Sequence, residues 1–291
     1  MKYLSLTLAV FGLLGVIAAD SAAAQESAEQ TIDYKAHMMV FNGTPEEVKQ
    51  FLSTGYDVNE SLNCRTLLDE AIENVLKVVR EFPESIMEKI QIVIDAGADV
   101  NAAGCPTSLL PLAKAASLPN QGVQRQKQML ELWDNDMNTG GKYCQSYFGP
   151  TPCNEVSTLE KKIARASFAT VLEKNRLGRA PQYLRTVKIL LDNGAIIDKQ
   201  DAFGQTALHL AAQNPKGESL EPLKYLIERG ADVNIRDNKG NTPLHIAFAS
   251  ENDDAVDILI KAGANTQIRN NAGKLYNQVA RGVPDIRPKG K

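Results

Sequence analysis

Three histidines carry the side chains best suited to acid–base or metal chemistry in this sequence. His245 lies 18 residues before Gly263, and His37 keeps the same spacing from its own glycine. His209 takes the equivalent place once three extra residues before its glycine are allowed for. If these units stack side by side, the sites lie about 10 Å apart, since helix axes pack at about 8 to 10 Å. One metal ion cannot be shared over that distance, so we predict structural histidines and no metal site.

Other catalytic signatures are weak. The sequence has no nucleophile elbow, no HExxH motif and no phosphate-binding loop. Residues 139–142, Thr-Gly-Gly-Lys, lack the spacing of such a loop and are predicted to form a turn. We therefore predict no enzyme, no catalytic residue and no cofactor. The alternative that stays open is an enzyme or redox sensor with its site in residues 117–180.

Four cysteines, Cys64, Cys105, Cys144 and Cys153, occur without the CxxC or histidine spacing of a metal site. In an oxidising compartment such cysteines favour disulfides. The short loop between Cys144 and Cys153 favours a local bridge, which leaves Cys64 to pair with Cys105. Four free buried thiols are the alternative.

The first 24 residues have the three-part form of a secretory signal peptide. Lys2 supplies the charge, residues 4–19 the apolar stretch, and small residues end at Ala24. We expect cleavage after Ala24, leaving residues 25–291 as a soluble protein in the periplasm or outside the cell. An uncleaved anchor is the alternative.

Composition describes an ordinary globular chain rather than a disordered or fibrous one. Of 291 residues, 43% are hydrophobic and 23% charged, with 32 basic and 35 acidic side chains. This balance offers no electrostatic footprint for nucleic acid. No later apolar run is long enough to span a bilayer, so we predict no membrane insertion after signal cleavage.

An internal repeat is the strongest signal for the fold. Residues 237–247, DNKGNTPLHIA, recur 36 positions upstream as DAFGQTALHLA, and each copy runs through an apolar helix into Gly-Ala. Thr206 and Thr242 can cap a helix, and the glycine can end the next one in a left-handed conformation. These residues resemble the ankyrin repeat, in the form found in exported bacterial-type proteins. The resemblance implies an all-α solenoid of helix-turn-helix-hairpin units, in which the repeat histidine hydrogen-bonds into neighbouring loops.

Weaker copies follow from glycines that end apolar helical runs. They predict one ankyrin repeat domain over residues 25–291 that closes with a partial, more polar cap. The predicted repeats cover about 31–60, 61–101, 102–198, 199–234 and 235–267, with an insertion at 117–180 in the third and the cap at 268–282.

The insertion is predicted to be a helical hairpin. Apolar residues recur with helical spacing over 124–137 and 158–177. In one interpretation a disulfide pins this hairpin, and Trp133 packs onto the solenoid. In the other, Trp133 and the aromatic Tyr143, Tyr147 and Phe148 anchor a partner.

The resemblance also implies partner binding at the tips of the hairpin loops. The candidate residues there are Phe203, Gln205, Lys239 and Asn241. We therefore predict a non-catalytic protein-binding module in the periplasm that uses these tips, the concave face and the insertion. A periplasmic adaptor and an immunity or inhibitor protein that occludes a toxin or enzyme both fit.

Overall fold

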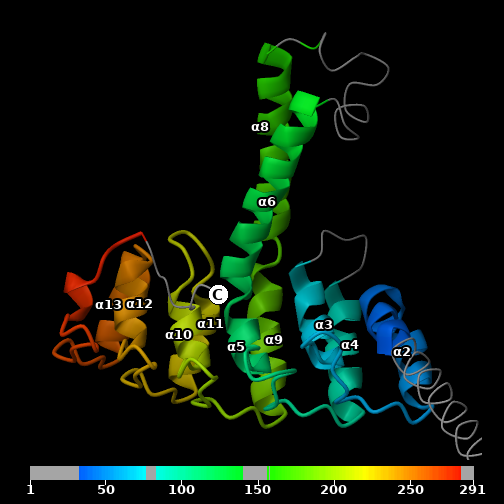
Figure 1. The fold of residues 1–291 in the computed structure, drawn as a ribbon, viewed down its shortest axis with the longest axis horizontal. Coiled ribbons are helices and arrows are strands. Elements are labelled where there is room, and N and C mark those ends of the chain that lie inside the picture. The colour runs from blue at the N-terminus through cyan, green and yellow to red at the C-terminus, as the bar shows by residue number, and fades with distance from the viewer. Residues whose placement is uncertain (1–32, 77–82, 140–155, 157, 283–291) are drawn as a thin grey trace, which may run out of the picture.

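The computed structural model describes residues 33–76, 83–139, 156 and 158–282. The described part consists of helices and loops, with a single isolated bridge between Leu62 and Arg65. Helix pairs stack in a row from one end of the molecule to the other (Figure 1). The all-α solenoid predicted from the sequence is confirmed.

Each unit contributes a first and a second helix, and neighbouring units pack against one another. α5 contacts α3 and α10, and α9 contacts α4 and α11. The first helices are residues 33–42, α3 (Leu67–Glu73), α5 (Pro111–Ala116), α10 (Ala207–Ala212) and α12 (Pro243–Ala249). The second helices are α2 (Pro45–Leu52), α4 (Pro83–Asp95), α9 (Ala180–Asp192), α11 (Glu221–Glu228) and α13 (Asp253–Lys261), with 3-10 turns η1 (Asn74–Leu76) and η2 (Tyr276–Gln278).

The helix ends follow from local chemistry. Thr66 begins α3, and its hydroxyl accepts the amide of Asp69 at 3.2 Å while the Asp69 carboxylate accepts the amide of Thr66. This reciprocal pair satisfies two amides that the helix leaves unpaired. The second helices end before a glycine with positive φ, a conformation that costs glycine little. These glycines are Gly55, Gly97, Gly194, Gly230 and Gly263.

One continuous core joins the repeats. Its buried apolar side chains extend from Ala36 in the first helix to Ala264 after the last. A solenoid of this kind gains stability from the faces between neighbouring units, because no single unit can bury its own apolar face.

The insertion forms an arm between the two helices of the third repeat. α5 ends at Ala116, and after Ser117 the chain continues as α6 (Leu118–Thr139), to which α8 (Thr158–Leu177) returns. The arm projects from the edge of the solenoid opposite the hairpin loops (Figure 1). The predicted helical hairpin is therefore present.

The packing of Trp133 differs from the prediction. Its indole is buried between α6 and α8, with Met137, Ala164 and Phe168, and not on the solenoid. The rings of Trp133 and Phe168 stack with centroids 6.1 Å apart. The reason is that the arm stands clear of the repeats and must form its own small core.

The predicted bridge between Cys64 and Cys105 is confirmed. It joins two adjacent hairpin loops, with Cα atoms 5.0 Å apart. The predicted signal peptide, the bridge between Cys144 and Cys153, and the aromatic residues Tyr143, Tyr147 and Phe148 lie outside the described residues. Among the helices that are described, none has the length and apolar character needed to cross a membrane.

Candidate functional site

Two of the three histidines are structural, as predicted. The Nδ1 atom of His209 accepts the amide of Thr206 at 3.2 Å, and its Nε2 lies 3.1 Å from the carbonyl of Asn241 in the next hairpin. His245 repeats this arrangement on Thr242, with Nε2 3.2 Å from the next carbonyl. Burial lowers the pKa of both imidazoles, so both stay neutral and join consecutive repeats.

His37 does not follow this pattern. The residue three positions before it is Tyr34, which cannot take the place of threonine as a cap. The Nδ1 atom of His37 lies 3.9 Å from the Glu70 carboxylate, too far for a hydrogen bond. Its Nε2 atom is buried and has no hydrogen-bond partner among the described residues. The expectation of one shared role for all three histidines is therefore wrong for His37.

The hairpin loop beside His37 explains the difference. In the regular hairpin the amide of Asp237 donates to the carbonyl of Asn241. Here the amide of Leu62 donates to the carbonyl of Arg65 at 2.9 Å, so this hairpin is one residue shorter. Its two central residues, Asn63 and Cys64, both have positive φ, 52° and 64°, as a two-residue hairpin turn requires.

The disulfide and a close backbone approach hold this short loop in place. A Cβ atom at Gly104 would lie 2.5 Å from the carbonyl oxygen of Cys64. The Ser108 hydroxyl also donates to that carbonyl at 2.9 Å. The two loops are therefore joined by a disulfide, a hydrogen bond and close backbone packing beside the first repeat.

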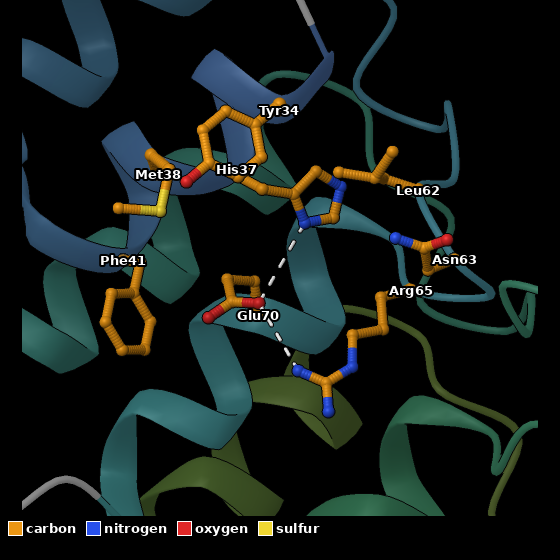
Figure 2. Close-up of a pocket in the computed structure, with 8 residues that line it drawn as sticks. All are labelled: Tyr34, His37, Met38, Phe41, Leu62, Asn63, Arg65 and Glu70. Carbon is orange, nitrogen blue, oxygen red and sulfur yellow. Dashed lines mark ion pairs between the residues drawn. The ribbon is translucent and has the colours of Figure 1, made fainter. Parts of the chain in front are cut away.

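A cavity of about 420 Å³ opens between the first helix and this loop. Figure 2 shows Tyr34, Met38 and Phe41 lining one side and the Glu70 carboxylate between them and the Arg65 guanidinium. The three apolar residues are spaced i, i+4, i+7, so they share one face of residues 33–42. All three are exposed, Tyr34 to 60%. A cavity of this size lies within the range of ligand sites.

Charged groups from two neighbouring repeats meet behind the cavity. Asp69 occupies the place that histidine takes in the later repeats, and it pairs with the buried Lys114 at 2.9 Å. Lys114 also lies 3.3 Å from Glu73, which pairs with Arg65 at 3.1 Å. Among the residues that the structure describes, the Glu70 carboxylate has two distant partners, Arg65 at 3.7 Å and His37 at 3.9 Å. The cluster thus holds three carboxylates against two permanent cations.

The predicted hairpin-tip residues differ in how they are placed. Lys239 is exposed, and Phe203 and Asn241 are half-buried. Gln205 is only 1% exposed and directly precedes Thr206, the residue that caps α10. Trp133 is buried in the arm. Neither Gln205 nor Trp133 offers a side chain to a partner, so their predicted binding role is not carried further.

The arm has two contrasting edges. Successive residues of a helix point about 100° apart, and α6 and α8 face each other through Trp133 and Ala164. The two helices run antiparallel, so the residues that follow two facing residues lie on the same edge of the pair. Asp134 and Arg165 are these residues. The geometry is confirmed by their two contacts, at 2.6 and 2.9 Å.

The opposite edge is apolar. Leu132 and Ile163 each precede one of the core residues, and Leu159 lies one helical turn before Ile163. Their exposed fractions are 55% for Leu132, 58% for Ile163 and 68% for Leu159. Large apolar side chains gathered on one edge of a projecting element are typical of an interaction surface. The helical spacing of Leu159 and Ile163 was visible in the sequence, but their exposure was not.

Within the described ranges, no group of three or more His, Cys, Asp or Glu side chains is arranged to hold a metal ion.

A family model described as "Ankyrin repeats (3 copies)" matches residues 179–270. No curated protein matches the chain. The matched stretch begins at the return from the arm and covers the two repeats in which His209 and His245 join successive hairpins. Residues 179–270 are therefore ankyrin repeats, and the helix pairs before them continue the same stack (Figure 1).

Proposed function

We propose that this protein is an exported, non-catalytic module that binds a protein partner mainly through the apolar edge of its arm. Ankyrin repeats are generally protein–protein interaction modules and are typically non-catalytic. The observation that carries the proposal is the exposure of Leu132, Leu159 and Ile163 along one edge of a projecting hairpin. The Cys64–Cys105 disulfide supports export to an oxidising compartment, the periplasm or the outside of the cell.

The three exposed side chains are not needed to hold the arm together. Contacts between α6 and α8 include the buried cluster around Trp133, the hydrogen bond from Gln126 to Glu173 and the ion pair on the other edge. Leucine and isoleucine side chains exposed to water add no hydrophobic stabilisation. Burying each one fully against a partner contributes about 1.5 to 3 kcal/mol to the free energy of binding. The arm also stands away from the solenoid (Figure 1), so a partner can reach this edge.

The hairpin tips form a second, lesser part of the proposed surface. Lys239 is exposed at its tip, and the half-buried Phe203 lies on the neighbouring tip. These tips lie on the edge of the solenoid opposite the arm (Figure 1). A partner that touches both must extend along the whole height of the repeats.

Affinity capture with a matched control tests the proposal. The bait is residues 25–291, and the variant carries Leu159→Ser and Ile163→Ser. The control carries Lys162→Ser and Ala166→Ser, which change exposed residues on the outer face of the same helix. We expect one protein of the cell envelope to be captured by bait and control and lost with the apolar-edge variant. Equal capture by all three forms would contradict the role of this edge.

An adaptor and an inhibitor are separated by a second measurement. If the captured protein is an enzyme or toxin, its activity is measured with one equivalent of residues 25–291 added. An inhibitor abolishes that activity at equal stoichiometry, whereas an adaptor leaves it unchanged. Export itself is tested by the mass of the protein recovered from the periplasmic fraction, which we expect to match cleavage after Ala24.

A further inference from the structure

We propose that the cavity beside His37 binds a basic side chain, arginine or lysine, of an extended partner peptide with apolar neighbours. This inference rests on the proposed protein-binding function and names the chemistry of a partner segment. It concerns a surface at the N-terminal end of the solenoid, separate from the arm. Three features of the cavity carry it: an acid without a hydrogen bond, an apolar wall, and a histidine nitrogen without a partner.

The acid is Glu70. It is 8% exposed, and no described side chain donates a hydrogen bond to its carboxylate. The nearest cation, the Arg65 guanidinium, is 3.7 Å away and lies closer to Glu73, at 3.1 Å. A buried carboxylate is stable only when it is paired, and the surrounding cluster has one carboxylate more than it has permanent cations. A ligand cation beside Glu70 would balance this charge.

The wall favours a cation carried on an apolar stem. Tyr34, Met38 and Phe41 present two aromatic rings and a thioether to the cavity (Figure 2). Arginine and lysine place a hydrocarbon stem against apolar surface and keep a charged head at its end. Their cations are also attracted to aromatic faces. Part of the wall remains exposed, so it can also receive the apolar side chains that flank the basic residue.

The histidine shows where a peptide backbone would lie. In both regular repeats the equivalent Nε2 atom bonds a backbone carbonyl, that of Asn241 or Lys274. The shortened loop at residues 62–65 removes this carbonyl from the reach of His37, whose Nε2 is left buried and unpartnered in the described structure. The atom is covered when the cavity is empty, so a carbonyl from a bound peptide takes this place once a neighbouring side chain moves aside. One backbone contact and one charged contact together fix the direction of the peptide.

A peptide-display selection on residues 25–291 tests this inference. Selection is repeated on Glu70→Gln, which removes the charge and keeps the shape, and on Glu84→Gln. Glu84 is an exposed acid that pairs with Arg185 at 2.7 Å, away from the cavity, and serves as the matched control. We expect peptides enriched in a basic residue between apolar residues from the unmodified protein and the control, and no basic enrichment from Glu70→Gln.

Defined peptides then measure the charge recognition. The best arginine peptide is compared with the same peptide carrying citrulline, its neutral counterpart, by fluorescence polarisation. We expect at least tenfold tighter binding of the arginine form to the unmodified protein, and equal binding of both forms to Glu70→Gln. Tyr34→Ser changes an exposed residue and keeps the acid, so it should weaken both peptides and preserve their ratio. Circular dichroism checks that each variant is folded.

The outcomes separate this inference from the proposed role of the arm. Selected peptides without basic residues, or an unchanged preference for arginine in Glu70→Gln, would overturn it. If Glu70→Gln fails to fold, loss of affinity for both peptides in Tyr34→Ser supports the cavity, and unaltered affinity refutes it. The variant Leu159→Ser with Ile163→Ser should bind the peptides normally, since the arm does not line the cavity.

Discussion

Removing the Cys64–Cys105 disulfide should destabilise the first two repeats by about 4 kcal/mol. The bridge closes a loop between residues 41 positions apart in the sequence. A loop of that length corresponds to about 4 kcal/mol of chain entropy withheld from the unfolded state. The perturbation is the double substitution Cys64→Ser and Cys105→Ser, and reduction of the unmodified protein by dithiothreitol should have the same effect.

The loss should be local, because each repeat of a solenoid contacts only its neighbours. Hydrogen exchange read by mass spectrometry resolves this. We expect faster exchange in α2, α3 and α4, and unchanged exchange in α12 and α13 at the other end. Urea unfolding followed by circular dichroism should then show an early transition that the unmodified protein lacks.

A third variant separates the bridge from the backbone conformation of Cys64, whose φ is 64°. Serine at this position keeps the penalty for a left-handed conformation, about 1 kcal/mol, which glycine avoids. Cys64→Gly with Cys105→Ser should therefore be more stable than the double serine variant by about that amount. A loss below about 1 kcal/mol in the double serine variant, or exchange that rises equally in all repeats, would refute the reasoning.

Three further predictions follow from buried groups. Burial lowers the pKa of His209 and His245, so the unfolded chain binds more protons than the folded protein in acid. The urea midpoint should therefore fall as the pH drops below about 6.5. A constant midpoint between about pH 7.5 and 5.5 would contradict this. Lys114→Met leaves the buried carboxylate of Asp69 unpaired and should lower the free energy of unfolding by about 3 to 5 kcal/mol, less when Asp69→Asn is added. Trp133 is the single tryptophan, so its fluorescence reports on the core of the arm. Because that core is small, the fluorescence should change at a lower urea concentration than the circular dichroism. Coincident transitions would show that the arm and the solenoid unfold together.

The regular repeats could be predicted from sequence because local chemistry alone dictates them. Thr206 and Thr242 each begin a helix three residues before a histidine, and the glycine after each second helix has positive φ as expected. The pairing of Cys64 with Cys105 followed from elimination, given a local bridge between the other two cysteines. The insertion was recognised because two helical patterns interrupt the third repeat.

The departures depend on contacts between repeats, which a repeat pattern does not show. His37 has the spacing of its counterparts, yet its partner is lost because a neighbouring loop is one residue shorter. Glu70 follows the histidine position of its own repeat, and only the structure shows its carboxylate at a cavity wall. Gln205 stands at a loop tip in the sequence but is covered in the fold. Spacing along the chain gives the register of a residue, not what faces it from the next unit.

This contrast bears on where a partner can bind. In the regular hairpins the polar groups are used in stacking: the amide of Asn238 donates to the carbonyl of Phe203 at 3.0 Å, and that of Asn271 to the carbonyl of Lys239 at 3.0 Å. The same consensus residues that make a repeat recognisable therefore satisfy one another. Among the described residues, buried unpaired atoms occur both beside the shortened loop, at His37 Nε2, and in a regular hairpin, at Gln205 Nε2. The arm differs in exposing large apolar side chains along one edge. We expect most of the binding energy at the cavity beside His37 and along the apolar edge of the arm, because a partner can supply contacts there that the fold itself leaves unmade.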